Sequence, residues 1–281
     1  MAMPKLNIVG CGHVGRVFAR LFAQHQVFQV QDILNRNQGS SAHALLFVGV
    51  GRALESLHDL RAARVWLLGV NDDQILPLAQ ALWAAHKLRP GDIVFHLSGA
   101  MPAAALHSLQ QHGVLVASVH PIRSFADPAR VLADFAGTCC TLEGDAKALQ
   151  LLQDALQRIG ARVLPIDGSK KAQYHAASVF ACNYLNTLFE VALQNWEAAG
   201  ISRAQAQEFA APLVRETLEN ILRLGPAPAL SGPLARGDMQ TVARHQQALQ
   251  ASNPQHAALY DAFIPLTQQL AEQKRAASKT D

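Results

Sequence analysis

The sequence is poor in charged and aromatic residues, and it has no long apolar run. Of the 281 residues, 16% are charged and 6% are aromatic, and the formal net charge of +3 is not collected into a basic block. A chain without a basic patch is not expected to bind nucleic acid. No apolar run approaches the roughly 18 residues of a membrane-spanning helix, and the first residues lack the pattern of a signal peptide. We therefore expect a cytoplasmic protein with no membrane partner.

Cysteine is also scarce. The four cysteines, Cys11, Cys139, Cys140 and Cys182, have neither the C-x-x-C spacing of a zinc site nor the density of a disulfide scaffold. We expect reduced, mostly structural thiols and no metal site.

The pattern of the chain changes near residue 166. Before that point short β-rich runs alternate with helical stretches, which predicts an α/β fold with a doubly wound parallel sheet. After it the chain is rich in Ala, Leu, Gln and Glu at helical spacing, which predicts an all-α domain. The expected strands are 6–9, 27–34, 64–70, 92–97, 114–119 and 162–166, and the expected helices between them are 13–25, 73–87, 102–112 and 145–159. The predicted domains are therefore 1–166 and 167–281.

The segment "NIVGCGHVG" contains a G-x-G-x-x-G motif between the first strand and the first helix. Gly10 permits a tight turn, Gly12 lets backbone approach a pyrophosphate, and Gly15 lets the helix pack close to the strand. The helix start then offers amide groups to the phosphates. This predicts a Rossmann-type dinucleotide site, the alternative being a turn that binds nothing. The loop residues expected to bind the cofactor are Gly10, Cys11, Gly12, His13, Val14 and Gly15.

The tip of the second expected strand bears on which dinucleotide binds. NAD sites usually place an acidic residue there, but the sequence reads "LNRNQGSS", and Asp32 lies further back in the strand. An arginine suits a 2′-phosphate, so we favour NADP over NAD. The alternative for Arg36 is a solvated loop arginine. The alternative for the glycines is an S-adenosylmethionine site, which usually also has an acidic residue at the tip of this strand. The ligands expected here are Asn35, Arg36, Ser40 and Ser41.

Ligands of open α/β sheets lie across the carboxyl ends of the strands. The loop "GVNDDQI" therefore brings Val70, Asn71 and Asp72 toward the nicotinamide half of the cofactor. The alternative for Asp72 is that it only caps the next helix.

Two later loops carry residues suited to binding substrate. "HLSGAMP" offers Ser98 and Gly99, a small loop able to hold a carboxylate, and "VASVHPIRSF" offers His120, which can donate to a carbonyl or titrate. The alternative for His120, and the favoured one for His96, is a buried histidine bonded to backbone.

The stretch "SKKAQYHAASVFACNY" (169–184) gathers polar residues on one side of an expected helix. Because successive residues of a helix are about 100° apart, the polar residues fall on one stripe along the helix. The opposite face, with Phe180, Tyr184 and Leu188, is expected to be buried. A polar stripe on an apolar helix has to face water or a cleft, and this helix begins where the two domains meet. We interpret the stripe as part of the site, the alternative being a solvated face. Its members are Lys171, Tyr174, His175, Ser178, Cys182 and Asn186, with Asn183 at the edge.

The order of these motifs resembles the superfamily of 6-phosphogluconate and β-hydroxyacid dehydrogenases, which pairs an NAD(P) domain with a helical one. Within it the chain is most similar to the Rossmann-like family whose helical half is called domain of unknown function 2520. The matching segments are "GCGHVG", "WLLGVNDDQI", "HLSGA", "HPIRSF", "KKAQYHAASVFACNY" and "ALSGPLARGD".

The resemblance implies roles for several residues. Relatives carry a lysine as acid/base on this helix, followed by substrate-binding residues at three and four positions, which here are Tyr174 and His175 after Lys171. Their helical domains interlock as dimers, so the late loop with Arg236 is expected to complete the partner's site and clamp a carboxylate.

These expectations combine into one functional hypothesis and one alternative. The hypothesis is an NADP-dependent oxidoreductase that moves hydride between the nicotinamide and a small oxo- or imino-acid, similar to ketopantoate and pyrroline-carboxylate reductases, and that forms a homodimer. The alternative is a sensor that binds NADP(H) without catalysis. The expected catalytic residues are Lys171, Tyr174 and His175, and the expected substrate ligands are Ser98, Gly99, His120, Asn183 and Arg236.

Overall fold

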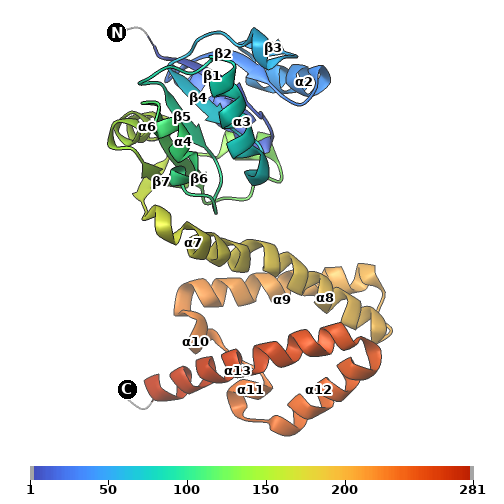
Figure 1. The fold of residues 1–281 in the computed structure, drawn as a ribbon. Helices are drawn as coiled ribbons and strands as arrows, with labels where there is room; N and C mark the ends of the chain where they lie inside the picture. The colour runs from blue at the N-terminus through green and yellow to red at the C-terminus, as the bar shows by residue number, and fades with distance from the viewer. Residues whose placement is uncertain (1–2, 279–281) are drawn as a thin grey trace. The chain divides into compact units, whose positions relative to one another are not determined.

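The computed structural model describes residues 3–278, which form two compact units divided between Cys182 and Asn183 (Figure 1). The first unit holds the sheet and the helices around it. The second consists of helices.

The first unit is built on one eight-stranded sheet with the order β3-β2-β1-β4-β5-β6-β7-β8. All neighbouring strands are parallel except β6 and β7, which are antiparallel. The doubly wound sheet is thus confirmed, with one reversed strand. The strands are β1 (Lys5–Val9), β2 (Gln29–Leu34), β3 (Arg52–Leu54), β4 (Val65–Leu68), β5 (Ile93–His96), β6 (Leu115–Pro121), β7 (Cys139–Gly144) and β8 (Arg162–Pro165).

Helices cover both faces of this sheet, and a separate hydrophobic cluster fills each face. Phe18 and Phe22 anchor one cluster and pack edge-on against Phe135 and Phe28. The expected helix 102–112 is instead a 3-10 turn (Ala103–Leu106) followed by a short helix, and α2 was not expected. The helices of this unit are α1 (His13–Gln24), α2 (Gln38–Val48), α3 (Asp72–Ala84), α4 (His107–Gln110), α5 (Pro128–Ala133), α6 (Ala146–Arg158) and α7 (Lys171–Ser178), with 3-10 turns also at Leu57–Asp59 and Gly168–Lys170.

The second unit is all-helical, as expected, but it buries few large side chains. Its helices are α8 (Tyr184–Ala198), α9 (Arg203–Leu224), α10 (Pro226–Ala229), α11 (Pro233–Arg236), α12 (Met239–Ser252) and α13 (Pro254–Ala277). Within residues 183–278, the buried hydrophobic residues are Leu193, Ala206, Ala210, Val242, Ala257 and Ala271. Most of these are alanines, so the unit has a thin core.

The helix after the last strand differs from its expected pattern. A π-helical segment, Val179–Asn183, separates α7 from α8, and a π turn shifts the helical phase. Lys171 is buried, whereas Phe180 and Tyr184 are 66% and 48% exposed and Leu188 is 37% exposed. The prediction that the apolar face would be buried is therefore wrong for the single chain.

The first unit also continues beyond the expected boundary at residue 166. The last strand ends at Pro165, but residues 167–182 remain with the sheet. The reason is that side chains of α7, Lys171 and Tyr174, are bonded to residues of β5, β6 and β7 or the loops after them.

One helical stretch, Gly168–Ala198, is long and apolar enough to cross a membrane, judged by length and composition alone. Its apolar 18-residue segment is 6% buried inside the protein. That evidence is weak, since Lys171 and Tyr174 in its first third are bonded to the sheet. The remaining helix α8 has 15 residues, whereas a spanning helix needs about 20.

Candidate active site

The glycine-rich loop has the geometry of a nucleotide cradle. Gly10 has φ +84°, and a Cβ added to it would lie 2.5 Å from Cγ1 of Val70. A Cβ at Gly15 would lie 2.9 Å from the Gly10 carbonyl oxygen, whereas one at Gly12 would meet no atom within 4 Å. The N-terminus of α1 has no side-chain cap, so its first amides remain available to phosphates. The cradle therefore fits a dinucleotide, with Gly12 facing open space.

The tip of β2 is held by side chains that sequence reasoning had assigned to the cofactor. Asn35 Oδ1 accepts from the Cys11 amide at 2.6 Å, and the Asn35 amide donates to Ser41 Oγ at 2.9 Å. Ser41 is fully buried and its hydroxyl also bonds the Asn37 carbonyl. This corrects the expectation for Ser41, which shapes the loop instead of meeting a phosphate. Arg36 and Ser40 are exposed at the tip.

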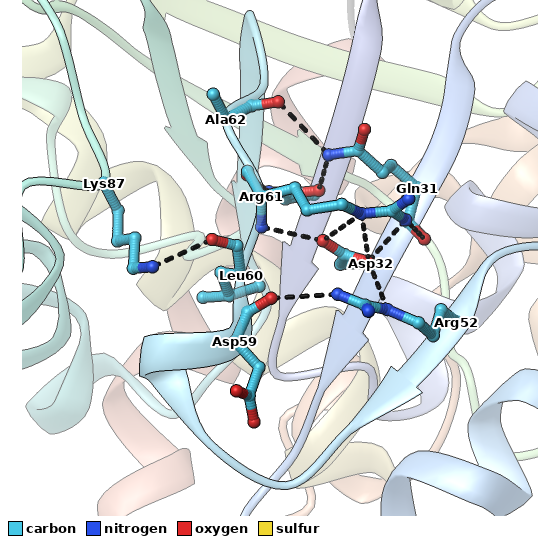
Figure 2. Close-up of polar contacts among 9 residues, drawn as sticks. Gln31, Asp32, Arg52, Asp59, Leu60, Arg61, Ala62 and Lys87 are labelled. Carbon is cyan, nitrogen blue, oxygen red and sulfur yellow. Dashed lines mark hydrogen bonds and ion pairs between the residues drawn. The ribbon is translucent and has the colours of Figure 1, made fainter.

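Asp32 is occupied inside the sheet (Figure 2). Its fully buried carboxylate accepts from the Arg61 amide at 2.9 Å and from the Arg61 guanidinium at 2.7 Å, and it lies 3.2 Å from Nε of Arg52. Burial alone would raise the pKa of Asp32, but hydrogen bonds and charge from Arg61, and then the charge of Arg52, outweigh burial and lower it. Asp32 is therefore a structural residue, as its position in the strand predicts.

A hydrogen bond joins the loop after β5 to the first residue of α3. Ser98 Oγ donates to Asp72 Oδ2 at 2.7 Å and accepts from the amides of Ala100 and Met101 at 3.2 and 2.9 Å. The capping position before α3 is held by Asn71, so Asp72 serves the Ser98 loop. The Ser98 hydroxyl has its donor and both acceptor positions filled by the protein. This corrects the expectation that the hydroxyl binds substrate.

Lys171 lies beneath these loops and not at their surface. It is 1% exposed, and Nζ donates to the Ser98 carbonyl at 2.8 Å and to Ser118 Oγ at 2.5 Å. Glu143 Oε1 is 3.9 Å from Nζ. Burial lowers the pKa of Lys171 to about 8, against the raising effects of Glu143 and Asp72. Sequence reasoning missed Ser118 and Glu143, because Ser118 looks like a small strand residue and β7 was not recognised.

His120, near the end of β6, and Tyr174, in the middle of α7, form a hydrogen-bonded pair. His120 Nδ1 is 2.7 Å from the Tyr174 hydroxyl, which also accepts from Thr141 Oγ1 at 3.4 Å. Burial, followed by the charges of His175 and Lys171, lowers the pKa of His120 to about 4. Burial likewise raises the pKa of Tyr174. Both groups are therefore neutral near pH 7.

Gly99 is enclosed by two imidazoles. A Cβ at Gly99 would lie 2.4 Å from His175 Nδ1 and 2.8 Å from His120 Nε2, and the two rings stand edge to face with centroids 5.5 Å apart. His175 Nδ1 is buried, and no hydrogen-bond partner for it occurs among residues 3–278. The structure thus brings together His120, Tyr174, His175 and Gly99, four of the residues expected in the site.

His96 matches the interior-histidine alternative. It is fully buried, and its Nδ1 accepts from the Ser98 amide at 3.3 Å. Burial, and then the charge of Lys171, lowers its pKa to about 3.

The remaining expected residues lie elsewhere. Asn183 and Arg236 belong to the second unit, so their part in the site stays a prediction.

Burial raises the pKa of Cys11 and of Cys140 to about 12, which keeps both as inert thiols near neutral pH. Within the described part of the chain, no group of three or more metal-ligating side chains occurs.

Two family models match the chain, one after the other. The Rossmann-like domain model matches residues 2–121, and the model of the domain of unknown function DUF2520 matches residues 138–265. No curated protein matches the chain.

Solved structures of similar fold cover nearly the whole chain. A candidate NADP oxidoreductase from Bacteroides fragilis is 18% identical with a TM-score of 0.77, covering 95% of this chain and 99% of its own. An imine reductase from Myxococcus stipitatus in complex with NADP+ is 16% identical with a TM-score of 0.69, covering 96% and 95%. Pyrroline carboxylate reductase from Plasmodium falciparum with NADP bound is 12% identical with a TM-score of 0.59, covering 96% and 99%. At these identities the likeness concerns the fold alone. The chain therefore carries a Rossmann-like domain followed by a domain of unknown function 2520.

Proposed function

We propose that the protein is an NADP-dependent reductase that transfers hydride to the carbonyl or imine carbon of a small oxo- or imino-acid. The observation that carries the proposal is the neutral His120–Tyr174 pair. It lies at the carboxyl ends of the strands, the edge of the sheet where the glycine cradle also lies. The bound cofactor supplies the hydride, so the protein has to supply orientation and one proton. Imine and pyrroline carboxylate reductases among the structural neighbours support this class of substrate.

The chain's own residues suit these tasks. Gly12 and the start of α1 receive the phosphates, and Arg36 with Ser40 receives the 2′-phosphate. In the Nδ1–H tautomer His120 donates to the Tyr174 oxygen, which leaves the Tyr174 proton for the substrate oxygen or nitrogen. Tyr174 then recovers a proton from His120 Nδ1 while Nε2 takes one from water.

The preference for NADP rests on two features of the β2 region. Asp32 is fixed inside the sheet by Arg61 and Arg52, so no carboxylate of this strand is available to ribose hydroxyls. Arg36 is exposed at the strand's tip instead.

For the substrate carboxylate we propose Arg236, whose guanidinium suits a bidentate contact.

The test is stereospecific hydride transfer from NADPH deuterated at C4. We expect one of the two C4 positions to pass its label to a product in a panel of small oxo-acids and cyclic imino-acids. Tight NADPH binding without label transfer to any member would contradict a reductase.

One observation favours the alternative of a non-catalytic NADP(H) sensor. The Lys171 ammonium and the Ser98 hydroxyl, two of the expected working groups, are both taken up by contacts within the protein. The same label-transfer experiment decides between the two, because a sensor binds NADPH and leaves the label in place.

We also propose that the second unit forms a homodimer in the cytoplasm. Two apolar hollows of about 500 and 440 Å³ flank α8, and Leu222 on α9 is 86% exposed. A unit with mostly alanine in its core gains its missing burial from a second copy, because isologous contacts cover the same face twice. Other large hydrophobic residues exposed on this unit are Tyr184, Leu185, Leu188, Phe209, Leu213, Leu218, Leu224, Met239, Phe263 and Leu266.

A further inference from the structure

Lys171 joins three separate parts of the first unit. Its ammonium donates to the Ser98 carbonyl after β5 and to Ser118 Oγ on β6, and it lies 3.9 Å from Glu143 on β7. Ser118 Oγ also donates to the Ser98 carbonyl at 3.3 Å. Two protons of the ammonium therefore have acceptors in the protein itself, and the Glu143 carboxylate is an ion-pair partner at 3.9 Å.

The Lys171 side chain is covered by the protein. It is 1% exposed, and its ammonium is hydrogen-bonded to the Ser98 carbonyl and to Ser118. The groups that face Gly99 are instead the rings of His120 and His175.

Glu143 secures the other end of this arrangement. Its Oε1 accepts from the Ala103 amide at 2.6 Å, and a Cβ at Gly168 would lie 2.8 Å from Oε2. The carboxylate thus packs against the turn that begins the helix of Lys171.

We propose that Lys171, held by Ser98, Ser118 and Glu143, is a positioning residue that fixes the rotation of α7 and so places Tyr174 against His120, while Tyr174 gives the proton. The inference deepens the proposed reductase function and rests on it for the proton step. Lys171 and Tyr174 are three residues apart, so they lie on one side of the helix about one turn apart. Anchoring Nζ beneath the sheet ends therefore sets where the Tyr174 hydroxyl lies.

The first test needs no activity. The ¹⁵N signals of the His120 ring, assigned with His120→Gln, report its hydrogen bond to Tyr174. We expect Lys171→Met to shift these signals as Tyr174→Phe does, and Glu143→Gln to shift them in the same direction. The matched control is Lys170→Met, an exposed neighbour, which should leave them unchanged. Unchanged His120 signals in folded Lys171→Met and Glu143→Gln would overturn the positioning role.

The second test separates positioning from proton transfer, using whichever substrate of the panel is reduced. We expect Lys171→Met to lower kcat about 10²-fold through misplacement, with NADPH affinity within about twofold and no rescue by added alkylamines. Rescue of Lys171→Ala by methylamine would identify Lys171 as the proton donor and overturn the proposal. If no substrate is reduced, the reductase function fails while the NMR test still decides whether Lys171 positions Tyr174.

Discussion

Burial decides which polar residues of this site remain available for chemistry. Ser98, Ser41 and Lys171 were expected to meet ligands, but each is buried and hydrogen-bonded to other groups of the protein. His120 and Tyr174 are only partly buried, and His120 faces Gly99 in the loop after β5. Of the residues expected in the site, His120 and Tyr174 therefore remain partly accessible to a ligand.

Two glycines give a matched pair of substitutions. In Gly99→Ala the new Cβ would lie 2.4 Å from His175 Nδ1, so we expect the free energy of unfolding to fall by about 1–3 kcal/mol. In Gly12→Ala the Cβ meets no atom within 4 Å, so stability should stay within about 0.5 kcal/mol while NADPH affinity falls. Urea unfolding and fluorescence titration measure the two effects, and a destabilised Gly12→Ala would contradict the open cradle.

The adjacent serines and Arg36 test cofactor choice. Arg36→Ala and Ser40→Ala should weaken NADPH binding about tenfold or more and NADH binding little, because each removes a proposed contact to the 2′-phosphate. Ser41→Ala should instead lower stability without changing the NADPH to NADH ratio, since its hydroxyl bonds only the Asn35 amide and the Asn37 carbonyl. Calorimetric dissociation constants measure this. Equal losses for both nucleotides in Arg36→Ala would rule out the 2′-phosphate role.

Two histidines with lowered pKa values, the buried His96 and the partly buried His120, predict how stability depends on pH. Burial lowers the pKa of His96 to about 3 and that of His120 to about 4, whereas both titrate near 6.5 when unfolded. Between these values the unfolded chain binds more protons, so the free energy of unfolding decreases as the pH falls from about 6.5 toward 4. In His96→Gln, the free energy of unfolding measured with urea should change less steeply with pH across this range. Parallel slopes in variant and wild type would contradict a neutral, buried His96.

At the element scale, the sheet is held by polar contacts as well as by apolar packing. Asp32 on β2 joins Arg52 of β3 to Arg61 of the segment before β4 (Figure 2). Gln31 adds bonds to the Asn7 side chain and the Ala62 carbonyl. These contacts lie beside the parallel hydrogen-bond ladders and fix the segments that enter them.

This arrangement predicts unequal effects for two ion pairs. Arg61→Met leaves a fully buried Asp32 without its main partner, so we expect a loss of about 1–3 kcal/mol in the free energy of unfolding. The pKa of Asp32 lies below its usual range in the folded chain, so its contribution is present near neutral pH and is lost as the pH falls through that value. Arg203→Ala breaks an exposed pair with Glu190 and should leave stability nearly unchanged. Denaturant unfolding of both variants at pH 7 checks this, and equal losses would contradict it.

Elements with strong local patterns were predicted well, and weak ones were missed. Helices α1, α3 and α6 and the central strands match their expected ranges closely, because apolar periodicity and turn residues mark them. Strand β3 has three residues, and β7 begins with two cysteines, so neither carries a clear strand signal. The missed β7 explains why Glu143 was also missed.

At the scale of the whole molecule, the two units differ in how much they bury. The first has two apolar clusters with large aromatic residues, and the second buries mainly alanines. A folded unit of this size normally gains most of its stability from apolar burial. The proposed homodimer supplies what the second unit lacks.

The matched variants are Leu222→Glu on α9 and Leu46→Glu on α2, which replace leucines that are 86% and 82% exposed. We expect Leu222→Glu to shift the protein toward monomer in sedimentation equilibrium, because a carboxylate in an apolar interface costs desolvation. Leu46→Glu should leave the association state unchanged. A wild-type protein that is monomeric at micromolar concentration, or that partitions into liposomes, would contradict the homodimer.

The sequence by itself determined the order of the two domains, the sheet class, the glycine cradle and the stretch of helix that carries Tyr174 and His175. These follow from local spacing, because periodicity and turn chemistry act over a few residues. Only the tertiary structure decided which of the polar residues are covered: Lys171 beneath the strand ends, Ser41 under the β2 tip, and Ser98 within its own loop. Burial depends on residues distant in the chain, such as Glu143 beside Lys171, and no local pattern specifies which of them will meet.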